Sequence, residues 1–105
     1  MIYSKEYPLK NRNQYVRLLV KILTKKYDVI QSRISLKIGM NPNYFRDFSS
    51  ARKDLNEENI DKIESYLIDL YEGIFMFEIP QEKEEFDSFM ENLDDSTIYS
   101  EYVLN

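Results

Sequence analysis

Glycine and proline, the residues that most often interrupt helices, occupy only five of the 105 positions in this chain. Between them, apolar residues recur at helical spacing. The first such group follows the pattern i, i+3, i+4, i+7, i+8 and comprises Tyr15, Leu18, Leu19, Ile22 and Leu23. We therefore expect an all-α fold, a compact helical domain of four to five helices.

The residue types that are missing exclude several classes of function. Cysteine and histidine are absent, so the chain can form neither a disulfide nor a zinc site with thiolate or imidazole ligands, and it lacks Cys and His nucleophiles. The two glycines, Gly39 and Gly73, are too few for a glycine-rich phosphate-binding loop. No pair of carboxylates stands in an apolar setting with a third group to tune it. We expect no enzymatic activity, no catalytic residue, no metal and no cofactor.

Charge is divided unevenly along the chain. Residues 1–55 carry 12 Lys and Arg against 4 Asp and Glu, which is a net charge of +8. Residues 56–105 carry only Lys62 and Lys83 against 15 carboxylates, which is −13. Such asymmetry indicates a nucleic-acid-binding surface joined to an acidic segment. We expect a basic N-terminal arm and helical domain over 1–72, followed by an acidic C-terminal extension over 73–105.

Helix boundaries can be placed in the basic half. Residues 1–12 have no clean period and contain Pro8, so we expect an extended arm there, with a helix from Asn13 that Lys25 and Lys26 close. A second helix spans about 30–38, with Ile30, Ile34 and Ile38 on one face, and Gly39 follows as its left-handed C′ residue. A third begins with Asn41 as N-cap and Pro42 in the first turn, and ends at about Ser49 or Ser50.

The acidic half predicts two more helices. One begins after Asn56 and ends either at Gly73 or at Glu78, before Pro80. Its apolar stripe comprises Ile60, Ile63, Leu67, Leu70, Tyr71 and Ile74. The other follows Pro80 and carries Phe86, Phe89, Met90 and Leu93 on one face. We expect the last dozen residues to form an extended tail.

The segment from Gln31 to Phe48 is the strongest functional signal, because two short helices joined by a glycine-containing turn form a helix-turn-helix. The inward positions are Ile34, Ile38, Met40, Phe45 and Phe48, with the small Ser35 where the helices cross.

The string VIQSRISLKIGMNPNYFRDF resembles the helix-turn-helix motif of the Cro/Xre-type repressors of phages and mobile elements. The wider resemblance to this family covers about Tyr15 to Leu67. Two features depart from the family's pattern: Ser35 replaces the usual alanine, and the common Glu-x-Gly after the recognition helix is absent. The string GMNPNYF also resembles one motif of AraC-type activators, whose second copy is not found here. The resemblance implies a transcriptional regulator, most simply a homodimeric repressor, in the cytoplasm of a bacterial or phage-infected cell and without a membrane partner.

In a helix-turn-helix the second helix enters the major groove of double-stranded DNA with its N-terminal residues at the base edges. The base-reading candidates are therefore Asn41, Asn43, Tyr44, Arg46 and Asp47. Asn43 and Arg46 suit adenine and guanine. Asn41 is equally suited to capping the helix, Tyr44 to packing, and Asp47 to pairing with Arg46 or a lysine.

Phosphate contacts are expected on both sides of that helix. The candidates are Gln31, Ser32, Arg33, Lys37, Arg52 and Lys53. We also expect Lys5, Lys10 and Arg12 to form an arm along DNA.

The acidic half leaves alternatives open. Its apolar residues either close the core of a monomer or build a dimer or partner interface, for which the candidates are Leu70, Tyr71, Ile74, Phe86, Phe89 and Met90. A carboxylate cluster is either solubilising, or covers the basic half, or mimics phosphate towards a protein target; it includes Glu82, Glu84, Glu85, Asp87 and Glu91. The last alternative, a protein-binding inhibitor, resembles anti-CRISPR proteins of phages in size and composition.

Overall fold

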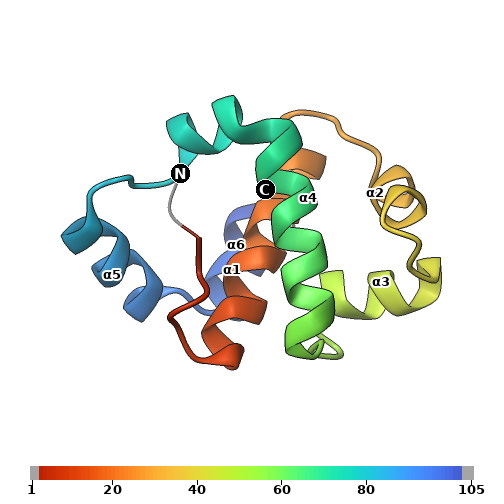
Figure 1. Ribbon diagram of the computed structural model, residues 1–105, viewed down its shortest axis with the longest axis horizontal. Helices are drawn as coiled ribbons and strands as arrows, with labels where there is room; N and C mark the ends of the chain where they lie inside the picture. Colours follow the sequence, from red (N-terminus) through yellow and green to blue (C-terminus); the bar gives the residue numbers. More distant parts are fainter. Residues whose placement is uncertain (1–2, 103–105) are drawn as a thin grey trace.

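The computed structural model describes residues 3–102, with side chains for residues 3–98, and every regular element in that part of the chain is helical (Figure 1). The elements are α1 (Leu9–Lys21), the π-helix η1 (Ile22–Lys26), α2 (Gln31–Lys37), α3 (Pro42–Ser49), α4 (Glu57–Glu78), α5 (Lys83–Asn92) and α6 (Asp95–Tyr102). The predicted all-α class is confirmed. Six α-helices form instead of four or five because the segment after Asp94, expected as an extended tail, is helical. The side chain of Asp94 accepts the Thr97 N–H and so satisfies a free donor in the first turn of α6.

Helix α1 is the central element, because α3, α4, α5 and α6 all pack against it. Nine consecutive residues, from Arg12 to Val20, are buried. A helix buried on every side must either be apolar or have its polar side chains hydrogen-bonded within the protein, and α1 contains buried residues of both kinds. It begins at Leu9 rather than at Asn13, directly after Pro8.

Helix α4 settles the alternative left open at Gly73, since it continues to Glu78. It is kinked at Tyr71, where φ is −120° and ψ is 27°. Asn56 caps it as predicted, with its side chain accepting the Asn59 N–H. The predicted stripe is wrong at Leu70, which is 57% exposed, whereas Ile68 is fully buried. Positions two apart lie on different sides of a helix, so the side that buries Ile68 turns Leu70 to solvent.

The C-terminal third is part of the same core and not a separate extension. Its buried side chains join those of α1 and α4 in one cluster and comprise Phe75, Ile79, Phe86, Met90 and Ile98. Phe86 stacks edge-to-face on Tyr15, with ring centroids 5.4 Å apart. Phe86 and Met90 are 0% and 1% exposed, so the prediction that they form a dimer or partner interface is wrong for these two residues.

Candidate nucleic-acid interface

Helices α2 and α3 lie at one end of the molecule, opposite α5 (Figure 1). The turn between them depends on Gly39, whose φ of +70° is in the left-handed region that side chains disfavour. Its N–H donates to the Leu36 carbonyl, and the Met40 N–H donates to that of Ser35. The prediction that Gly39 is the left-handed C′ residue of α2 is confirmed.

The two helices are held together by the apolar positions that the sequence indicated. Ile34, Phe45 and Phe48 are at most 1% exposed. Ser35 is buried where α2 packs on α3, and its hydroxyl donates to the Ser32 carbonyl. Of the two remaining predicted inward residues, Ile38 is also buried and Met40 is half-buried against the core. Ile30 is the exception: it is 53% exposed because α2 begins only after it, at Gln31.

The first turn of α3 is anchored by Asn41. Its side-chain oxygen accepts the N–H groups of Asn43 (2.8 Å) and Tyr44 (3.2 Å), so the capping alternative holds for this residue. Asn43 and Arg46 are exposed, and neither side chain has a hydrogen bond or ion pair within the described part of the chain. The helix thus presents an amide and a guanidinium to solvent.

The other two base-reading candidates are engaged within the chain. Tyr44 is half-buried, and the Lys53 ammonium lies 4.9 Å from the centroid of its ring. Asp47 lies 3.7 Å from the Arg52 guanidinium. Its backbone carbonyl also accepts the N–H groups of Arg52 and Lys53, which fixes the loop after α3.

The predicted phosphate-binding residues lie on α2 and in the loop after α3. Ser32, Arg33, Lys37, Arg52 and Lys53 are all exposed. Arg33 and Lys37 pair with no carboxylate of the described residues. Gln31 differs, because its side chain accepts a hydrogen bond from the Ser49 hydroxyl at 2.9 Å and so connects α2 to the end of α3.

The expected N-terminal DNA arm is wrong for Arg12, which is 2% exposed and points into the protein. Its guanidinium donates to Asp61 (2.6 Å) and to the buried Glu64 (3.0 Å). Glu64 also accepts the N–H and hydroxyl of Ser4. Burial opposes the charged form, yet the hydrogen bonds that Arg12 donates to Asp61 and Glu64 leave its pKa raised. Lys5 and Lys10 remain exposed.

Arg17 is a structural residue that sequence reasoning counted only as part of the basic half. It is 2% exposed and stacks over Phe48, with its guanidinium carbon 4.7 Å from the ring centroid. It donates to the Phe48 carbonyl at the end of α3 and pairs with Asp54 (3.0 Å) and Asp95 (2.7 Å). The sequence offered one signal of its burial, because Arg17 stands between the apolar residues Val16 and Leu18. Arg17 therefore fixes the end of α3 against both α1 and α6.

The remaining candidates lie away from α3. Leu70 is well exposed, whereas Tyr71, Ile74 and Phe89 are half-buried against the core. Glu82, Glu84, Glu85 and Glu91 are exposed. Asp87 differs from them: it accepts hydrogen bonds from the Tyr7 hydroxyl and the Lys83 ammonium, and these lower its pKa.

Residues 3–102 contain no group of three or more acidic residues placed to hold a metal ion, and no helix among them is long and apolar enough to cross a membrane. The chain matches no protein-family model, no curated protein and no solved structure.

Proposed function

We propose that this chain is a sequence-specific, double-stranded DNA-binding transcriptional regulator, most simply a repressor of a phage or mobile element. In this proposal α2 and α3 form a helix-turn-helix, and α3 lies in the major groove. The observation that carries the proposal is the outward face of α3, where exposed Asn43 and Arg46 side chains have no partner in the described structure. These two side chains can each form bidentate hydrogen bonds with a purine.

The surroundings of α3 support this assignment. Between Gln31 and Lys53 the chain carries five basic residues and one acidic residue. Exposed cations on α2 and in the loop after α3 suit the phosphate backbones that border a groove. The helix itself is rigidly held, by its Asn41 cap, by buried Phe45 and Phe48, and by the contact of Arg17 with its last turn.

We further propose that the protein binds DNA as a homodimer. Leu70, at 57% exposed, and the half-buried Tyr71 and Ile74 offer an apolar surface on α4. A dimer would place two copies of α3 on half-sites about one helical turn apart. Analytical ultracentrifugation of the parent and of Leu70→Glu tests this point. A parent that sediments as a monomer at micromolar concentration contradicts it.

Fluorescence anisotropy with labelled duplexes, including the DNA upstream of its own gene, tests the DNA-binding function. Titrations over a salt series should give affinity that falls as salt rises, with a preference for one sequence. Arg46→Ala and Asn43→Ala should each weaken binding to the preferred duplex by about tenfold to a hundredfold, and should narrow the difference from a random duplex. Lys37→Ala should weaken binding to both duplexes alike and reduce the salt slope by about one.

The matched control is Lys62→Ala, which removes one positive charge from an exposed position on α4. It should bind the preferred duplex like the parent. If Arg46→Ala and Asn43→Ala also bind like the parent, α3 does not read bases. If no duplex binds even at low salt, the DNA-binding proposal fails.

A second candidate function is a protein-binding inhibitor that uses the acidic half. The observation favouring it is that Glu82, Glu84, Glu85 and Glu91 are exposed and make no ion pair within residues 3–98. The double change Glu84→Lys with Glu85→Lys, which leaves the internally paired Asp87 intact, should abolish capture of a protein target. It should spare or strengthen DNA binding, so the two functions are distinguishable.

A further inference from the structure

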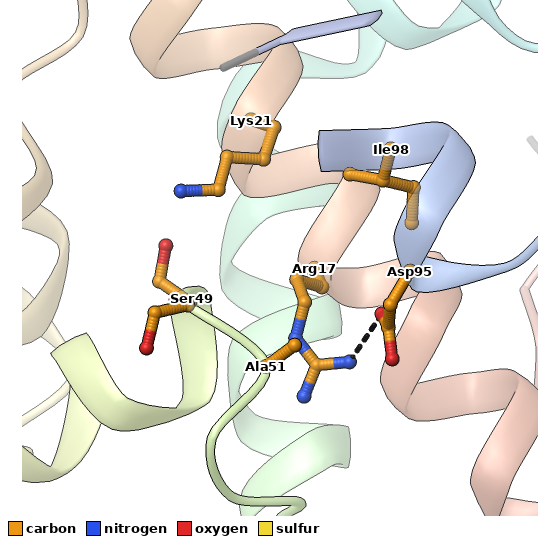
Figure 2. Close-up of a pocket in the computed structure, with 7 residues that line it drawn as sticks. Arg17, Lys21, Ser49, Ala51, Asp95 and Ile98 are labelled. Carbon is orange, nitrogen blue, oxygen red and sulfur yellow. Dashed lines mark hydrogen bonds and ion pairs between the residues drawn. The ribbon is translucent and has the colours of Figure 1, made fainter. Parts of the chain in front are cut away.

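A cavity of about 120 Å³ opens between α1, the end of α3 and the start of α6 (Figure 2). Figure 2 shows the Lys21 side chain reaching from α1 towards Ser49, with Ala51 beside Arg17 and with Asp95 and Ile98 on the side away from the Lys21 ammonium. The cavity is separate from the outward face of α3 that is proposed to read bases.

The two cations that line this cavity differ in their ion pairs. The Arg17 guanidinium on its floor pairs with both Asp95 and Asp54. Lys21 is half-buried, and no carboxylate of the described chain lies within ion-pairing distance of its ammonium. Burial, together with the positive charges of Lys25 and Arg17, lowers the pKa of Lys21. The cavity therefore contains one ammonium that has lost part of its hydration and has gained no counter-ion.

The rest of the lining limits what else could bind. The Ser49 hydroxyl is already committed as a donor to Gln31, and that of Ser50 to the Asp47 carbonyl. Ile98 is buried and apolar, and Ala51 presents only a methyl group. A ligand with one negative charge and a short apolar body matches one free cation and these walls. Phosphate, with its greater charge and many acceptors, would lack donors.

We propose that this cavity is a binding site for a small aliphatic monocarboxylate, with Lys21 as its counter-ion. The volume is about that of four water molecules in the liquid, which admits roughly four to six non-hydrogen atoms. Ser49 is the last residue of α3, so the bound carboxylate contacts the helix proposed to enter DNA. If the proposed DNA-binding function holds, such a ligand can regulate it.

Isobutyrate is the probe, and a ¹H–¹⁵N NMR titration of the full chain without DNA is the test. Saturable shifts should appear at the amides of Ser49, Ser50, Ala51 and Ile98, with a dissociation constant in the millimolar range. Isobutyramide, the neutral analogue of the same shape, should bind at least about tenfold more weakly, because hydrogen bonds to a charged group are the stronger ones.

Lys21→Gln should weaken isobutyrate binding by about tenfold or more, while Lys62→Gln, which removes the same charge from an exposed position on α4 that does not line the cavity, should leave it unchanged. The proposal is overturned if isobutyrate gives no saturable shift, if the amide binds equally well, or if Lys21→Gln retains the parent affinity. Because DNA is absent from the titration, failure here is distinct from failure of the DNA-binding proposal.

Discussion

The buried pair of Arg12 and Glu64 provides the sharpest test of what stabilises this fold. The two side chains are 2% and 1% exposed and lie 3.0 Å apart. Removing Arg12 leaves Glu64 buried without a counter-ion, and removing Glu64 leaves Arg12 with only the more exposed carboxylates of Asp61 and Glu57; breaking a buried pair typically costs about 3–5 kcal/mol. We therefore expect Arg12→Met and Glu64→Leu each to lower the free energy of unfolding by about 3 kcal/mol or more, a large part of the roughly 5–15 kcal/mol of a small domain.

The double variant separates this explanation from simple loss of packing. When both charges are replaced by apolar side chains, no uncompensated charge remains, and only the N–H and hydroxyl of Ser4 lose their acceptor. That loss costs about 1–3 kcal/mol. The double variant should thus be destabilised by at least about 2 kcal/mol less than the sum of the two single variants.

Asp61 supplies the matched control. It lies closer to Arg12 than Glu64 does, at 2.6 Å, but its side chain is 42% exposed. Water screens such a pair, so Asp61→Asn should cost about 1 kcal/mol or less. Urea unfolding followed by far-ultraviolet circular dichroism measures all four variants. Additive single changes, or equal losses for Glu64→Leu and Asp61→Asn, would refute the reasoning.

Three further predictions use other features. Gly39→Ala should destabilise the fold by about 1–2 kcal/mol, because the φ of Gly39 is positive. Gly73→Ala should stabilise the fold by about 0.5–1 kcal/mol, because Gly73 is helical with open space around it. Urea unfolding that shows a change of the same sign for both variants contradicts this prediction. Tyr15→Phe should be neutral or stabilising by up to about 1 kcal/mol in thermal unfolding, since the buried hydroxyl has no hydrogen-bond partner among the described residues. The Lys26 ammonium donates two hydrogen bonds to Glu78 and lowers the pKa of that carboxyl below 4.5. The stability that this ion pair contributes is therefore present above pH 4.5 and is lost as the pH falls through the lowered pKa of Glu78. An NMR titration of the Glu78 carboxyl carbon should show this lowered pKa, and Lys26→Gln should raise it; an unchanged titration would contradict the assignment.

Local rules predicted the parts of the fold that depend on neighbouring residues. The turn at Gly39, the cap at Asn41, and burial of Phe45 and Phe48 all follow from spacing within a few positions. The bend of α4 at Tyr71 did not, because Gly73, two residues further on, indicated an end of the helix and not a bend within a helix that continues.

Two buried arginines were missed for a different reason. Arg12 finds Glu64 52 residues away, and Arg17 finds Asp95 78 residues away, so no pattern within one helix reports either pair. Helix α6 was also missed, since its sequence, DSTIYSEY, does not separate clearly into an apolar and a polar face. The residues proposed to read DNA are exposed as expected, and their role stays a prediction.

The pairing of α1 with acids from distant segments has a consequence for the order in which the protein becomes structured. A ribosome releases α1 first, carrying two arginines that the finished fold removes from water. Their counter-ions appear much later, Glu64 in α4 and Asp95 at the start of α6. Until then, Arg17 can pair only with Asp54, and Arg12 lacks its buried partner. A chain that ends before Asp95 therefore lacks one of the two ion pairs of the arginine that fixes the end of α3.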